Sequence, residues 1–241
     1  MRAAPRTVRL LAFTPTVATI WSTRHEALVP MARRTPQHAR PRVRPRSRTG
    51  GVEGNARFTS SFAAVIFILL FVEGVTIVSI RSLLTPHIFI GVLLIPPILM
   101  KIASTTWRMM KYYAGNHEYR LKGPPAPLLR LLGPVLVVLT LVLLFSGVGL
   151  VVGAPVSSRP LLFTIHRASF VLWFGVMAIH VLGHAIDTAR FAPRDWLAYT
   201  RRQVRGASAR QWSLGASLVI GAIGAAIITP YAANWHVAFF G

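Results

Sequence analysis

The stretch GPVLVVLTLVLLFSGVGLVVG, residues 133–153, decides the fold class of this chain. It contains no charged residue, and about 20 apolar residues are enough for a helix to cross the hydrocarbon core of a bilayer. The whole apolar segment runs over about 128–153, and four others of similar character lie at 58–80, 86–105, 161–186 and 214–231. These segments predict an all-α integral membrane protein with five transmembrane helices.

The composition supports a membrane protein, with 53 % hydrophobic and 14 % charged residues. The net charge of +21 would ordinarily suggest nucleic acid as a partner. The basic residues, however, concentrate in a few polar segments, where they typically set membrane topology or contact anionic lipid. We therefore expect membrane lipid as a partner and no nucleic acid. The absence of cysteine excludes disulfides, thiolate iron–sulfur clusters and covalent haem attachment.

Three parts follow one another along the chain. Residues 1–57 are rich in Arg and Pro and predict a disordered cytoplasmic tail, in which Met31 could be the true start and 1–30 a gene-model artefact. Residues 58–187 predict a four-helix transmembrane bundle, and 188–241 a basic loop and a fifth helix. The positive-inside rule places both basic loops and the N-terminus in the cytoplasm and the C-terminus outside.

Four histidines lie within the apolar segments: His87, His166, His180 and His184. His166 and His180 are fourteen residues apart, so on one helix their directions agree to within about 40° and they lie about 21 Å apart along the axis. His87 heads the second segment, which runs parallel to the fourth, so His87 and His166 should share a depth near the extracytoplasmic boundary. Titratable groups at such depths indicate function. Two opposed imidazoles predict axial ligation of b-type haem, with Arg81 and Arg167 as cations for its propionates.

The number of haems stays open from the residues alone. His180 and His184 are one helical turn apart toward the cytoplasmic side, and either could bind a second haem, or the pair could bind another metal. The first segment offers no histidine, however, and the position fourteen after His87 is Lys101. One haem is therefore slightly favoured over two. Glu73, the only acid well inside a span, either relays protons or hydrogen-bonds a neighbouring helix.

The motifs IHRASFVLWFGVMAIH (165–180) and TPHIFIGVLL (85–94) resemble those of the membrane b-type cytochrome subunits of prokaryotic respiratory enzymes. Relatives include the formate dehydrogenase gamma and nickel–iron hydrogenase cytochrome subunits. The resemblance implies a cytochrome-b-like bundle in a bacterial-type plasma membrane. It implies haem-iron ligands His87 and His166 for an outer haem and His180 for an inner one, although the first-helix histidine of that family is missing.

The activity that the resemblance implies is electron transfer between a quinone pool and a peripheral redox partner, without bond-making by the protein itself. Such a chain is an electron-transfer subunit rather than a stand-alone enzyme. The alternative is a haem-free membrane anchor, assembly factor or transporter subunit.

Overall fold

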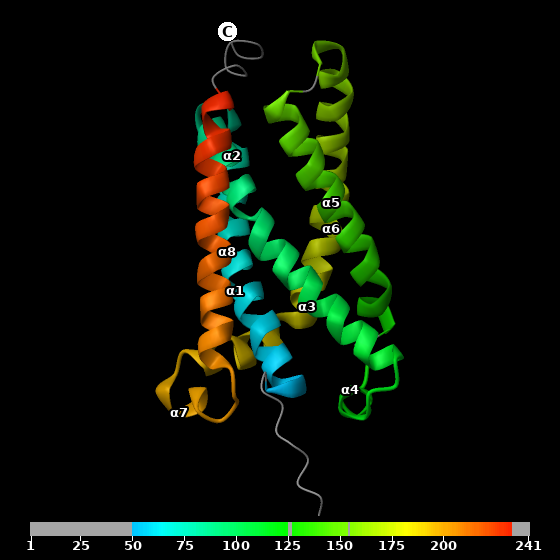
Figure 1. The fold of residues 1–241 in the computed structure, drawn as a ribbon. Coiled ribbons are helices and arrows are strands. Elements are labelled where there is room, and N and C mark those ends of the chain that lie inside the picture. The colour runs from blue at the N-terminus through cyan, green and yellow to red at the C-terminus, as the bar shows by residue number, and fades with distance from the viewer. Residues whose placement is uncertain (1–49, 125–126, 154, 233–241) are drawn as a thin grey trace, which may run out of the picture. The chain divides into compact units, whose positions relative to one another are not determined.

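The computed structural model describes residues 50–124, 127–153 and 155–232, and in this part of the chain it contains helices and no strand. The long helices, drawn in Figure 1, are α1 (Gly51–Val78), α2 (Ile80–Leu93), α3 (Ile95–Tyr113), α5 (Pro127–Val152), α6 (Arg159–Phe191) and α8 (Ala207–Ile228). The short ones are α4 (His117–Lys122), α7 (Ala198–Arg201) and the 3-10 turns η1 (Val156–Ser158), η2 (Ala192–Asp195) and η3 (Thr229–Ala232).

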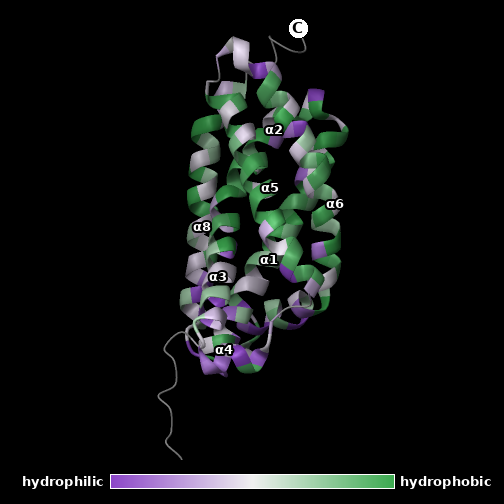
Figure 2. Cartoon of the chain, turned by 90° about the vertical axis from the view of Figure 1, so that its right-hand side faces the viewer, coloured by the Kyte–Doolittle hydropathy of each residue, from purple (hydrophilic) through white to green (hydrophobic). Residues whose placement is uncertain are grey.

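The described residues form five helical segments that are long and apolar enough to cross a membrane, with α2 and α3 together making one of them. In each span at most 28 % of the most apolar window is buried inside the protein. The remaining apolar side chains face outward, where lipid can cover them, and Figure 2 shows hydrophobic residues along the spans and hydrophilic ones gathered near α4. The expectation of an all-α protein with five membrane-compatible helices is thereby confirmed.

The first helix begins earlier than the sequence suggested. We expected a disordered tail up to residue 57, whereas α1 starts at Gly51, and the side chain of Arg57 is completely buried. The polar first turns of α1 belong to the folded part because their side chains find partners on other elements. The rest of the expected tail, 1–49, and the question whether 1–30 belongs to the protein lie outside the described residues.

The second span also begins earlier than expected, and His87 does not stand at its head. A single residue, Ser79, separates α1 from α2, and Pro86 lies inside the helix rather than at its first position. Proline has no N–H for the carbonyl four residues earlier, and the backbone leaves helical geometry close by, at Leu83 (φ −110°, ψ 19°). The chain therefore makes a tight helical hairpin, with its bend just before His87.

Pro96 and Pro97 interrupt the second span near its middle, where α2 passes into α3 at Leu94. Because Pro97 lacks an N–H, the carbonyl of Leu93 loses its helical donor. Helix α8 packs onto this point so closely that a Cβ on Gly221 would lie 2.5 Å from the Leu93 oxygen. The small residues of the fifth span thus permit a close helix contact.

The long helices pack against one another in several pairs. Helix α5 lies along α6, while α1 contacts α2, α3 and α6, and α8 packs against α2 and α3. A buried apolar cluster, made by Phe62, Ile66, Leu94, Ile98 and Leu214, joins α1, the α2–α3 junction and α8. Figure 1 shows α2 and α6 both starting at the end away from α4, so they run in the same direction.

We call the end of the helices that carries α4 and α7 the basic end. It is defined by the basic residues Arg108, Lys111, Arg120, Lys122, Arg190, Arg194, Arg201, Arg202, Arg205 and Arg210.

Candidate functional site

The structure brings His87 of α2 and His166 of α6 together. Their ring centres lie 6.5 Å apart and the ring planes are nearly perpendicular, at 87°. Both side chains are only partly exposed. Since α2 and α6 share few backbone contacts, the two histidines meet by reaching toward each other across the space between the helices.

Helix α1 holds one nitrogen of His87. Nδ1 lies 3.0 Å from Glu73 Oε1 and 2.9 Å from Thr76 Oγ1. The Thr76 hydroxyl donates its own proton to the backbone carbonyl of Glu73 at 2.6 Å. Because that proton is already used, Thr76 Oγ1 must accept from His87. The network therefore assigns the proton to Nδ1 and leaves the lone pair on Nε2.

Helix α5 holds His166 in the same tautomer. Nδ1 lies 3.1 Å from the backbone carbonyl of Leu143, which can only accept, and 3.2 Å from Ser146 Oγ. The Ser146 hydroxyl itself donates to the same Leu143 carbonyl at 3.1 Å. Nδ1 of His166 must therefore carry the proton, and Nε2 again keeps its lone pair.

In its neutral form each imidazole thus offers the lone pair of Nε2, and in the described residues no hydrogen bond reaches either of these nitrogens. Imidazole binds first-row metals at roughly 2.0 Å, so two rings on opposite sides of one metal have centres about 6 Å apart. The observed 6.5 Å is close to that separation. A metal-binding histidine usually donates its other N–H to a carboxylate or a carbonyl, as both do here. The donor set fits a bis-histidine haem.

Two further residues shape this site in ways that the sequence did not reveal. A Cβ on Gly147 of α5 would lie 3.0 Å from Cε1 of His166, so the glycine lets the ring lie directly against the helix. Glu73 Oε1 contacts His87, while its Oε2 is buried without a hydrogen-bond partner. The sequence left two roles open for Glu73, proton relay or a hydrogen bond to a neighbouring helix. The observed contact is the hydrogen bond, between α1 and α2.

The two arginines expected at the propionates are exposed. Arg81 lies in the first turn of α2, and Arg167 follows His166 directly on α6. The guanidinium of Arg167 stacks over the ring of Phe163, 5.5 Å from its centre. Both lie on the side of the spans opposite the basic end.

The second group of expected ligands lies farther along α6. The ring centres of His180 and His184 are 4.7 Å apart, and Nδ1 of His180 is buried without a partner. From α3, the side chain of Lys101 lies near both rings. In the described part of the chain no group of three or more His, Cys, Asp or Glu side chains is placed to hold a metal ion.

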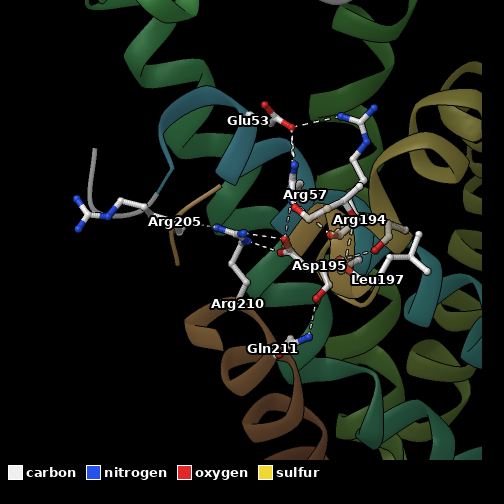
Figure 3. A network of polar contacts seen from close by, with 11 residues as sticks. Glu53, Arg57, Arg194, Asp195, Leu197, Arg205, Arg210 and Gln211 are labelled. Atoms are coloured by element: carbon white, nitrogen blue, oxygen red, sulfur yellow. Dashed lines mark hydrogen bonds and ion pairs between the residues drawn. The ribbon is translucent and has the colours of Figure 1, made fainter. Parts of the chain in front are cut away.

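A buried charge network at the basic end was not foreseen. Asp195 of η2 is about 2 % exposed and accepts hydrogen bonds from Arg210 of α8 and, at 3.3 Å, from Arg57 of α1. Glu53 accepts from Arg57 at 2.8 Å and from Arg194 at 3.3 Å (Figure 3). The spacing of Glu53 and Arg57 on one helix could have suggested their pair. Nothing in the sequence connects either residue with Asp195.

Comparison with known proteins gave no relative: no family model, no curated protein and no solved structure matches this chain.

Proposed function

We propose that this chain is a membrane cytochrome of the b type, in which His87 and His166 hold one haem between α2 and α6. One observation carries the proposal. Two imidazoles in apolar spans have both Nδ1 protons tied to oxygen acceptors and both Nε2 lone pairs unused, with ring centres 6.5 Å apart. A haem iron between the rings would bind both of these lone pairs.

The protein's own residues would orient and tune the ligands. Haem when bound supplies one-electron chemistry, and the potential depends on the ligands and their surroundings. Glu73 and Thr76 keep the lone pair of His87 directed away from α1, and the Leu143 carbonyl does the same for His166 from α5. These acceptors increase the basicity of the ligands and so favour ferric over ferrous iron.

One haem per chain is proposed rather than two. His180 and His184 stand on one helix, and the side chain that α3 supplies beside them is Lys101 rather than a histidine. If His180 nevertheless binds an inner haem, its second ligand must come from another source.

For the whole protein we propose electron transfer between a quinone pool and a peripheral redox partner, in a bacterial-type plasma membrane. The basic end would face the cytoplasm, because basic loops are retained there. Arg81 and Arg167, on the opposite side, are the proposed partners of the propionates. The C-terminal residues 233–241, which we expect outside, are not among the described residues.

The test is a dithionite-reduced minus oxidised absorbance spectrum of the full chain, purified in detergent after expression with ample haem supply. Sharp b-type bands with one haem per polypeptide, measured as the pyridine haemochrome, are expected. A featureless spectrum from folded protein would refute the proposal and leave a haem-free membrane anchor as the function to pursue. Two haems per chain would refute the single-haem assignment only.

A further inference from the structure

An open cavity of about 460 Å³ lies at the start of α8, independent of the histidine site. Its lining includes Arg201, Arg202 and Arg205 together with the first residues of the helix, Ala207 and Ser208. Three arginines on the lining of one open hollow make it strongly positive, which favours the binding of an anion.

No carboxylate of the described chain pairs with these three arginines. The acids nearby are already engaged, Glu53 with Arg57 and Arg194, and Asp195 with Arg57 and Arg210. Figure 3 shows the Arg205 side chain directed away from Asp195, while Arg210 reaches toward it. The positive charge of the cavity therefore stays uncompensated within the described residues.

The lining is held in place by contacts with neighbouring elements. Arg201 donates to Ser208 Oγ at 3.2 Å, and Arg210 donates to the backbone carbonyl of Arg205 at 2.8 Å. A Cβ on Gly50 would lie 2.3 Å from the side chain of Val204, so the start of α1 is packed tightly against this loop. Arg201 and the Arg205 backbone are thus positioned before any ligand arrives.

The depth of the cavity corresponds to the headgroup layer of a membrane. Ala207 and Ser208 are the first residues of the fifth span. Trp196, Leu197 and Trp212 are more than half exposed around the same loop, and exposed aromatic side chains mark the membrane interface. Farther along α8, Val219 and Ile220 expose apolar surface to which acyl chains can pack.

We propose that this cavity binds the phosphate of an anionic phospholipid, with its acyl chains along the outer face of α8. Guanidinium groups bind phosphate oxygens through paired, charge-assisted hydrogen bonds, which suits a phosphodiester headgroup of phosphatidylglycerol type. The chain would thereby select anionic over zwitterionic lipid in the leaflet at its basic end. The proposal does not depend on haem.

The experiment titrates the purified full chain in detergent with palmitoyl-oleoyl phosphatidylglycerol and counts bound lipids by native mass spectrometry. The cavity variant is the triple substitution Arg201→Gln, Arg202→Gln and Arg205→Gln. The control removes the same charge from exposed positions outside the cavity, Arg120→Gln, Arg130→Gln and Arg190→Gln. The affinity of the cavity variant should fall at least about tenfold, and that of the control less than about twofold.

A second variant guards against misfolding of the triple substitution. Ser208→Asp places a carboxylate in the first turn of α8, where the helix tolerates negative charge, yet it should repel phosphate and weaken binding. Equal losses in the cavity and control variants, or no loss in either, would overturn the proposal. So would phosphatidylcholine binding as tightly as phosphatidylglycerol. Glycerol phosphate that displaces the lipid at equal concentration would identify a soluble anion instead.

Discussion

His166 donates a hydrogen bond from Nδ1 to the backbone carbonyl of Leu143, and this contact of 3.1 Å joins α6 to α5. A carbonyl oxygen only accepts, so the contact determines which ring nitrogen carries the proton. His87 is held in the same tautomer by α1, although its partners are the side chains of Glu73 and Thr76. Helices α1 and α5, which carry neither histidine, therefore determine the directions of the Nε2 lone pairs of His87 and His166.

The ligand assignment predicts that His87→Ala and His166→Ala each abolish the haem signal. Each substitution removes one of the two proposed iron ligands. The control is His117→Ala, because His117 is exposed in α4 and should leave the reduced-minus-oxidised spectrum unchanged. Full haem content in both ligand variants would place the haem elsewhere.

Glu73→Leu should raise the midpoint potential of the haem and weaken haem binding by roughly 10- to 100-fold, as loss of a ligand's hydrogen-bonding partner typically does. Without the carboxylate, His87 becomes a poorer electron donor, and ferric iron loses more stabilisation than ferrous iron. Potentiometric titration with haem quantification measures both effects. Glu118→Gln, which alters an exposed acid of α4, is the control and should change neither. An unchanged midpoint potential in Glu73→Leu would show that Glu73 does not act on the haem.

The contact of His166 with α5 predicts a steric effect of Gly147→Ala. The added Cβ would lie 3.0 Å from Cε1 of the imidazole, so the ring must shift from its hydrogen bonds, and haem occupancy should fall. Gly149→Ala is the matched control, because its Cβ would meet only Leu162 Cδ1 at an ordinary 3.7 Å. Haem per chain after purification compares the two. Equal occupancy in both variants would contradict the proposed position of His166.

The helices could be predicted from the sequence because a membrane span is a local property. Length and apolar content suffice for it, and the five segments appear close to the expected positions. The meeting of His87 with His166 followed from topology, since parallel spans place residues at comparable depth. The bounds of α1 and α2 were predicted less well. Gly51–Arg57 is polar and Thr85-Pro86 looks like a helix start, yet both stretches lie inside helices.

The supporting residues could not be predicted, because their role depends on distances between helices. Nothing local distinguishes Gly147 from Gly149, or Leu143 from any other leucine of α5. Asp195 likewise stands among basic residues of a loop, and its burial requires Arg57 from far earlier in the chain. Such partners become visible only when the helices are packed.

The close contact at the proline kink predicts that Gly221→Ala destabilises the protein. The added Cβ would lie 2.5 Å from the Leu93 carbonyl oxygen, which is backbone and cannot rotate away, so α8 must move outward. Overpacking of this kind costs about 1–3 kcal/mol. Thermal unfolding in detergent should show a lower midpoint. Gly215→Ala, on the same helix with nothing within 4 Å, should leave the midpoint unchanged or raise it slightly.

The buried network at the basic end predicts a larger loss of stability in Asp195→Ala. Asp195 is the shared acceptor for Arg57 of α1 and Arg210 of α8, so its removal leaves two arginines of different helices short of a counter-charge. Removing one partner of a buried ion pair costs about 3–5 kcal/mol, far more than the loss of an exposed pair. The loop between α6 and α8 should also become accessible to protease, because Asp195 anchors it.

The control for that variant is Asp187→Ala, which removes an exposed carboxylate near the end of α6. Both variants change the net charge equally, so a difference between them reports the buried contacts rather than charge. Asp195→Ala should unfold at a clearly lower temperature and lose the loop to limited proteolysis first. Since the network lies at the opposite end of α1 from Glu73, any protein that remains folded should keep its haem spectrum. Equal stability of the two variants would mean that Arg57 and Arg210 find other acceptors or water.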